Sequence, residues 1–187
     1  MDLDEVNSIA IIGNPNTGKT NLAFSLMNKY EGKRKKYLFG YPKKVAGYKT
    51  VSTIDDLFQL KDSIIFMDEI QKFIKVYDKK ANTQLMELIS TFAHKKNTLI
   101  FTTQLSQFIT RGVEAFIDTW AITRIDMDTL KNGSKPKRLI QRLCDIRKTD
   151  WVLDLDVGEY YEHSFKNKIG SNKIKKFKNQ DIGKDWR

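Results

Sequence analysis

The sequence predicts an α/β fold built on a doubly wound, mostly parallel sheet with a basic C-terminal extension. Short continuous apolar runs alternate with amphipathic segments, and polar motifs directly follow several of these runs. The 187 residues are enough for one domain of ordinary size. We expect this domain to span residues 1–165. A basic, flexible tail is expected over residues 166–187, because they have no clear apolar period.

The expected strands are short apolar runs bounded by glycine, polar or charged residues, as in strands buried on both faces of a parallel sheet. They cover residues 8–12, 37–39, 63–67, 98–103 and 119–125. Two later segments, 139–146 and 151–161, are expected to form elements at the edge of the sheet.

The expected helices place apolar residues three and four positions apart. They cover residues 19–30, 53–60, 82–93 and most of 105–116. Thr53 is a favourable N-cap for the second of them. Helices that alternate with strands in this way are the crossover connections that a parallel sheet requires.

The net charge of +10 is concentrated in three segments, residues 33–49, 131–148 and 166–187, while the rest of the chain is net acidic. Such asymmetry suits a phosphate-rich partner, although a solvated lysine-rich surface would have the same composition. The single cysteine excludes an internal disulfide. No apolar run approaches 18 residues, so we expect no membrane insertion and a cytoplasmic protein, in the host cell if the protein is viral.

The strongest motif is GNPNTGKT, residues 13–20, between an expected strand and an expected helix. It fits G-x-x-x-x-G-K-[ST], in which glycines let backbone N–H groups surround phosphates and the lysine reaches the β and γ phosphates. The motif predicts a nucleotide site. Its expected members are Gly13, Asn14, Pro15, Asn16, Thr17, Gly18, Lys19, Thr20 and Asn21.

Two carboxylates, Asp68 and Glu69, directly follow the buried run 63–67. We expect Asp68 to hold Mg²⁺ together with the Thr20 hydroxyl, and Glu69 to act as the general base that polarises the attacking water. Gln104 follows the next strand and is expected within reach of the γ phosphate or that water. No guanine-reading N-K-x-D motif is evident, which favours ATP over GTP.

These motifs, followed by LIFTTQLSQFITRGVEAFIDTWAITR, resemble the FtsK–HerA superfamily of additional-strand P-loop ATPases, and within it the small viral genome-packaging ATPases. The resemblance covers roughly residues 6–126. It implies a polar sensor at Gln104 and catalytic arginines at Arg111 and Arg124, of which Arg111 is the preferred candidate to act on a neighbouring subunit. Pro15 and Asn16 depart from the usual Gly/Ser-rich loop, and residues 131–187 align with nothing in the family.

The resemblance also implies a homo-oligomeric ring, usually a hexamer, that pumps double-stranded DNA, with a capsid or portal protein as a candidate further partner. Candidate DNA contacts lie in the basic segments: Lys43, Lys44, Lys131, Lys135, Lys137 and Arg138.

The leading interpretation is therefore an ATPase that translocates DNA, as a viral or plasmid genome-packaging motor. Alternatives are a phage assembly or secretion ATPase resembling the zonula occludens toxin family, a small P-loop nucleotide kinase, and a nucleotide-gated DNA-binding module without appreciable turnover.

Overall fold

The computed structural model describes residues 1–73, 79–104, 111–126, 155–164 and 173–178. The strands within these ranges are β1 (Ser8–Ile12), β2 (Lys35–Phe39), β3 (Lys49–Val51), β4 (Ser63–Met67), β5 (Thr98–Thr103), β6 (Thr119–Ile122), β7 (Glu159–Ser164) and β8 (Lys173–Lys176). They form one sheet in the order β3-β2-β4-β5-β1-β6-β7-β8.

The sheet is parallel from β3 to β6, and β7 and β8 then add an antiparallel edge. This confirms the predicted doubly wound, mostly parallel α/β fold. Strand β5 lies between β1 and β4, so one strand separates the strand before the phosphate loop from the strand before Asp68. That insertion is the additional strand implied by the resemblance.

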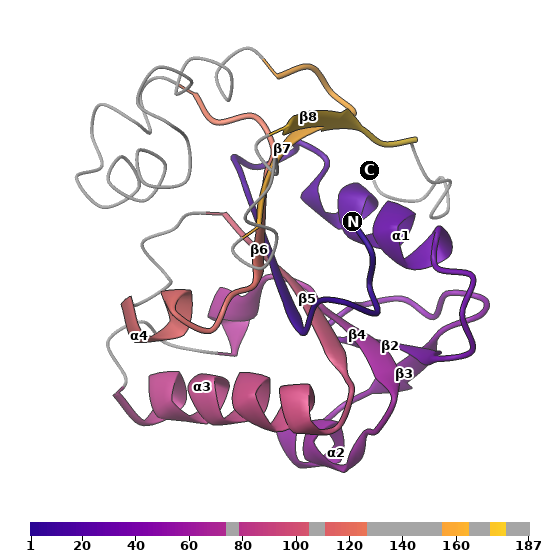
Figure 1. Cartoon of the computed structure of the whole chain (residues 1–187), viewed down its shortest axis with the longest axis vertical. Helices are drawn as coiled ribbons and strands as arrows, with labels where there is room; N and C mark the ends of the chain where they lie inside the picture. Colours follow the sequence, from indigo (N-terminus) through magenta and orange to yellow (C-terminus); the bar gives the residue numbers. More distant parts are fainter. Residues whose placement is uncertain (74–78, 105–110, 127–154, 165–172, 179–187) are drawn as a thin grey trace.

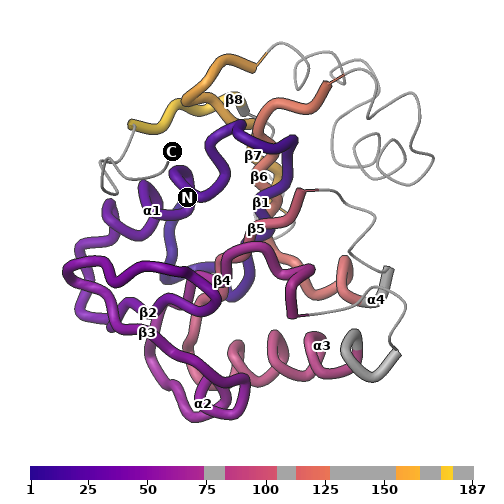
Figure 2. Tube along the Cα trace, turned by 180° about the vertical axis from the view of Figure 1, so that it is seen from behind, coloured from indigo at the N-terminus to yellow at the C-terminus, as the bar shows by residue number. Residues whose placement is uncertain are grey.

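Helices cover both faces of the sheet. Their bounds are α1 (Lys19–Asn28), α2 (Ile54–Gln59), α3 (Lys79–His94) and α4 (Arg111–Glu114), with a 3₁₀ turn η1 at Ile70–Lys72. Figure 1 shows α1 on one side of the sheet, close to the N-terminus, and α2 and α3 on the other; the reverse view in Figure 2 agrees.

Two apolar cores correspond to these two faces. Because side chains alternate along a strand, Ile9 and Ile11 of β1 pack in the core with α1, whereas Ala10 and Ile12 pack in the core with α2 and α3. The central strands are thus buried on both sides, and polar residues lie at or just beyond the carboxyl ends of β4 and β5, among them Asp68, Thr102 and Gln104. Parallel strands bring those ends together at one edge of the sheet, where ligands of this fold class bind.

The predicted helix cap and most of the predicted element boundaries agree with the structure to within a few residues. Thr53 caps α2, because its hydroxyl accepts a hydrogen bond of 3.1 Å from the Asp56 N–H. The expected fifth strand ends earlier than predicted, at Ile122. The expected element at 139–146, the first part of the helix at 105–116 and the beginning of the edge element at 151–161 lie outside the described residues.

The structure corrects the sequence prediction at both edges of the sheet. Strand β3 was not expected, because only Val51 of its three residues is buried. The prediction of a flexible tail over residues 166–187 is wrong for Lys173–Lys176, which pair with β7 as strand β8. Phe177 directly after β8 is buried in the α1 core. The strand is also held by ion pairs of Lys175 with Glu162 and of Lys176 with Glu159.

Among the described residues, no helix combines the length and the hydrophobicity needed to cross a bilayer.

Candidate nucleotide-binding site

The phosphate loop connects β1 to α1 and is held by residues that follow β6. Asn14 donates its backbone N–H to the Arg124 carbonyl at 3.1 Å, and its side-chain amide donates to the Asp126 carboxylate. The Thr17 hydroxyl lies 2.7 Å from the Asn14 carbonyl and 2.7 Å from the Thr123 hydroxyl. The loop is therefore braced before any ligand arrives.

Two glycines of the loop are required by their surroundings. A Cβ on Gly13 would lie 1.9 Å from Thr123 Oγ1, so only glycine allows this close approach. Gly18 caps α1 in the left-handed region, with φ 87°, and a Cβ there would lie 3.1 Å from Phe177 Cζ. The sequence motif predicted the glycines, but not their neighbours Thr123 and Phe177.

Lys19 is buried and turns back over the loop. Its Nζ donates to the Gly13 carbonyl at 2.9 Å and to the Asn14 carbonyl at 2.6 Å. Burial lowers the pKa of Lys19 to about 8, against the opposing effect of Glu69 and Asp68. An anion in the loop would restore the preference for the charged amine, which is the role expected of a phosphate-binding lysine.

Asp68 and Thr20 meet at the edge of the sheet. The Thr20 hydroxyl donates to Asp68 Oδ1 at 3.2 Å, and the Thr102 hydroxyl donates to the same oxygen at 2.9 Å. Burial raises the pKa of Asp68, and the two hydroxyl donors oppose that shift. A hydroxyl and a carboxylate side by side, next to a phosphate loop, form the donor set that Mg²⁺ uses with nucleotides.

The described residues fit a nucleotide-bound Mg²⁺ better than a protein-caged metal. Among them, no group of three or more His, Cys, Asp or Glu side chains could hold a metal ion. Magnesium in such sites has few protein ligands, and phosphates and water complete its shell. Thr20 and Asp68 would hold the ion, and it would supply charge neutralisation at the phosphates.

Glu69 has an unusual backbone, with φ 51° and ψ 68° in the left-handed region. Its carboxylate has a donor on each oxygen: Gln104 Nε2 lies 3.0 Å from Oε1, and Lys72 Nζ lies 2.6 Å from Oε2. The Lys72 hydrogen bond is the main cause that holds the pKa of Glu69 below its usual value, and Gln104 adds to it. An ionised carboxylate beside a phosphate loop can accept a proton from water.

The structure thus brings together Lys19, Thr20, Asp68, Glu69 and Gln104, all named from the sequence. Lys72, Thr102 and Thr123 were not predicted as site residues. Lys72 could have been suspected from its position three residues after Glu69. In the sequence, Thr102 and Thr123 look like ordinary strand residues, because threonine is common in strands.

The structure describes the side chains of only some of the arginine and lysine candidates. Arg124 is exposed next to the phosphate loop, whereas Arg111 begins α4 and its side chain lies outside the described part of the structure. Lys43 and Lys44 are exposed in the loop between β2 and β3. The candidates outside the described residues are Lys131, Lys135, Lys137 and Arg138.

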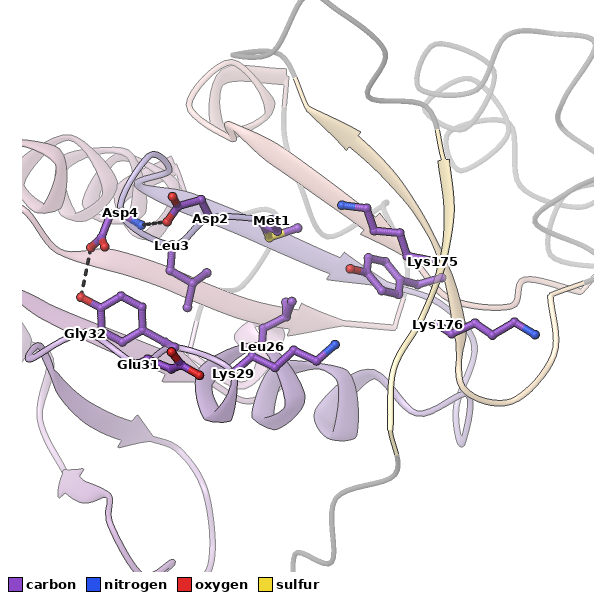
Figure 3. Close-up of a pocket in the computed structure, with 12 residues that line it drawn as sticks. Met1, Asp2, Leu3, Asp4, Leu26, Lys29, Glu31, Gly32, Lys175 and Lys176 are labelled. Carbon is purple, nitrogen blue, oxygen red and sulfur yellow. Dashed lines mark hydrogen bonds between the residues drawn. The ribbon is translucent and has the colours of Figure 1, made fainter.

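A cavity of about 620 Å³ lies elsewhere, beside α1 (Figure 3). It is lined by N-terminal residues from Met1 to Asp4, by the end of α1 with Lys29, and by Tyr160, Lys175 and Lys176 of the antiparallel edge. None of its lining residues belongs to the phosphate loop or to the Asp68–Glu69 pair, so it is separate from the nucleotide site.

Solved structures share this architecture. The genome packaging NTPase B204 from Sulfolobus turreted icosahedral virus 2, in complex with ATP-gammaS, matches with a TM-score of 0.68 and 17% identity, over 96% of this chain and 99% of that chain. The pCW3 conjugation coupling protein TcpA with ATPgS has a TM-score of 0.60 and 13% identity, over 97% and 63% of the two chains. EssC from Geobacillus thermodenitrificans has a TM-score of 0.63 and 14% identity, over 98% and 41%.

These similarities show that the chain shares the P-loop NTPase fold of these proteins, as the resemblance implied. No curated protein matches the sequence significantly. The family model for novel STAND NTPase 3 matches residues 2–111, which include the phosphate loop, the Asp68–Glu69 pair and Gln104. The chain therefore belongs to the novel STAND NTPase 3 family.

Proposed function

We propose that this protein is an ATP-hydrolysing motor that moves double-stranded DNA, as a packaging machine for a viral or plasmid genome. The observation that carries the proposal is the position of Glu69: its carboxylate accepts from Gln104 at 3.0 Å, directly after the strand that brings Asp68 to Thr20. A nucleotide-binding protein without turnover has no need for a second carboxylate held at this point.

The proposed chemistry follows from this arrangement. The loop N–H groups and Lys19 bind the phosphates, and Glu69 accepts a proton as water attacks the γ phosphorus and the bond to the β-phosphate oxygen breaks. Gln104, one strand away, orients the carboxylate. Arg124 or Arg111 of a neighbouring subunit would offset the charge that develops on the phosphoryl group.

The DNA part of the proposal is supported by the loop between β2 and β3. Tyr41 and Tyr48 pack edge-on against Phe24 of α1, with ring centroids 5.2 and 5.3 Å apart. This packing fixes a loop that presents Lys43 and Lys44 to solvent. A fixed loop backbone reduces the conformational entropy that is lost when its lysines bind phosphates. The full-length similarity to a genome packaging NTPase supports the same partner.

The test is the rate of ATP hydrolysis with and without long duplex DNA, in wild type and in Glu69→Gln. A motor should be stimulated several-fold by duplex DNA, and the Glu69→Gln variant should stay inactive in both conditions. Turnover that rises with a nucleoside or nucleotide acceptor, but not with DNA, would instead identify a kinase.

A secretion ATPase is the second candidate, because 96% of this chain matches a part of the Thermomonospora curvata Type VII Secretion ATPase EccC. That function predicts ATP hydrolysis without stimulation by DNA. Affinity for duplex DNA separates the two: a DNA motor should lose affinity steeply between 50 and 200 mM salt, because each neutralised phosphate releases counterions.

A further inference from the structure

Thr102 connects the two carboxylates of the nucleotide site through a single oxygen atom. It lies on β5 and is buried, with 1% of its surface exposed. Its hydroxyl donates to Asp68 Oδ1 at 2.9 Å, and the same oxygen accepts the backbone N–H of Glu69 at 2.8 Å. The proposed metal ligand and the proposed general base are therefore tied to one side chain.

The sheet register explains why Thr102 is at this place. Strands β4 and β5 are parallel, with Met67 opposite Phe101. The next residue of each chain segment is Asp68 and Thr102, so they are neighbours across the strands. Because side chains alternate along a strand, Thr102 faces the α1 side together with Ile100, which packs in the α1 core.

The hydrogen-bonding capacity of a hydroxyl makes the arrangement specific. Threonine has one O–H donor, which Asp68 uses, and lone pairs, one of which the Glu69 N–H uses. Serine could make both bonds. Valine has nearly the same shape as threonine but could make neither, and would leave the Glu69 N–H without this acceptor.

The bond to the Glu69 N–H also bears on the geometry of the base. Glu69 is in the left-handed region, a conformation that is strained for a non-glycine residue. Such a conformation persists only where its surroundings fix it. The Thr102 oxygen holds the backbone N–H of Glu69. Gln104 contacts its Oε1 and Lys72 contacts its Oε2.

We propose that Thr102 is a positioning residue that holds Asp68 for Mg²⁺ and Glu69 for the attacking water at the same time. The inference rests on the proposed nucleotide hydrolysis and extends it. A cation entering the site would draw the Thr20 hydroxyl toward itself, and Thr102 would then be the hydroxyl that keeps Asp68 in place.

The test compares Thr102→Val with Thr102→Ser. Calorimetric titration of a non-hydrolysable ATP analogue, with and without Mg²⁺, separates metal binding from nucleotide binding. Mg²⁺ should raise the affinity for the analogue at least ~10-fold less in Thr102→Val than in wild type. The kcat should also fall at least ~10-fold, because the hydrogen bonds of Thr102 to Asp68 and to the Glu69 N–H are lost. Metal-free binding of the analogue through Lys19 should stay within about 2-fold. Thr102→Ser should keep both properties within about 3-fold.

Thr103→Val is the matched control, since Thr103 is buried on the same strand but alternates to the opposite face. It should leave the Mg²⁺ effect unchanged. If Thr102→Val does not fold, as judged by thermal unfolding, Thr102→Ala takes its place against the same serine variant. The proposal fails if the valine or alanine variant retains the Mg²⁺ effect, or if serine fares as badly as valine.

The binding experiment also separates this inference from the proposed function. If the wild type binds the analogue with Mg²⁺ but hydrolyses no ATP, the motor is rejected while the difference between valine and serine in Mg²⁺ binding still tests Thr102.

Discussion

Lys72 Nζ lies 2.6 Å from Glu69 Oε2, one turn of 3₁₀ helix after the carboxylate it contacts. Gln104 occupies the other oxygen at 3.0 Å. Each carboxylate oxygen retains a second lone pair that can take a proton from water, but the Lys72 contact stabilises the ionised form and lowers the pKa of Glu69. The Lys72 side chain is 54% exposed, and exposed ion pairs contribute about 0–1 kcal/mol. The ion pair therefore weakens Glu69 as a base by no more than about 1 kcal/mol.

Lys72→Met should raise the basal rate of ATP hydrolysis by about 2–5-fold, because the carboxylate becomes a stronger base when an ion pair of up to about 1 kcal/mol is removed. Affinity for a non-hydrolysable ATP analogue should not change. Added salt should raise the wild-type basal rate toward that of the variant, since salt screens the ion pair. Steady-state kinetics without DNA measures both effects.

Lys61→Met is the control for removal of an exposed lysine, because Lys61 precedes β4, at the end of the strand opposite to Asp68. It should leave the basal rate unchanged. A slower Lys72→Met variant would mean that Lys72 orients Glu69 for catalysis rather than restraining it.

Glu69→Gln and Lys19→Ala should separate hydrolysis from binding. Glu69→Gln keeps the shape of the side chain but removes the proton acceptor, so hydrolysis should fall at least ~10²-fold while ATP binding persists. Lys19→Ala should instead lose binding, because no side-chain cation then meets the phosphates in the loop. Equal nucleotide affinity in the two variants would contradict the roles assigned here.

Much of this site was predictable because it lies where buried strands end. The runs 8–12, 63–67 and 98–103 are apolar enough to fix their strands, and parallel pairing then brings Lys19, Asp68 and Gln104 to one edge. No single segment of the sequence determines the order of the strands or the register between them. The resemblance implied an additional strand, but neither it nor the periodicity gave the full strand order.

The residues that escaped prediction depend on tertiary contacts. Lys72 meets Glu69 because Glu69 adopts a left-handed backbone, which no propensity indicates for glutamate. Thr102 continues a β-branched and aromatic strand, so its polar role is invisible without the partner strand. Strand β8 reads as a lysine-rich tail, and its pairing with β7 depends on where Phe177 finds a place to pack.

Phe177 should be a stabilising residue at the phosphate loop. Its buried ring packs beside Gly18 and lies 6.2 Å from the Tyr160 ring, centroid to centroid. Phe177→Ala should cost about 3–5 kcal/mol in the free energy of unfolding, and Phe177→Leu clearly less, because leucine refills most of the space. Chemical denaturation measures the difference. A Phe177→Ala variant as stable as wild type would show that the ring contributes no packing energy.

The arginine that completes the site is predicted to act from a neighbouring subunit. Mixing Arg111→Ala chains with Glu69→Gln chains should restore some ATP hydrolysis, because a mixed interface can combine an intact base with an intact arginine. The same mixture with Arg124→Ala tests the other candidate, which is exposed beside its own phosphate loop. Mixtures that assemble yet stay inactive at every ratio would place that arginine in the site of its own subunit, or outside catalysis.

Lys43 and Lys44 are predicted to couple DNA to hydrolysis. They are exposed on the loop that follows β2, and the carbonyl of Phe39 at the end of β2 accepts the Asp68 N–H at 3.2 Å. The loop proposed to bind DNA and the residue proposed to hold the metal ion thus share one edge of the sheet. Replacing both lysines by glutamine should reduce stimulation by duplex DNA several-fold. It should also lower the salt dependence of DNA binding by about 0.9 in log–log slope for each phosphate that is no longer neutralised.

Basal hydrolysis in this double variant should be unchanged, because neither lysine belongs to the nucleotide site. A double variant of Lys61 and Lys96 removes the same charge from exposed residues that precede β4 and β5, at the opposite edge of the sheet. It should lose far less stimulation than the Lys43 and Lys44 variant. Equal losses in the two double variants would mean that net charge, rather than this loop, attracts the DNA.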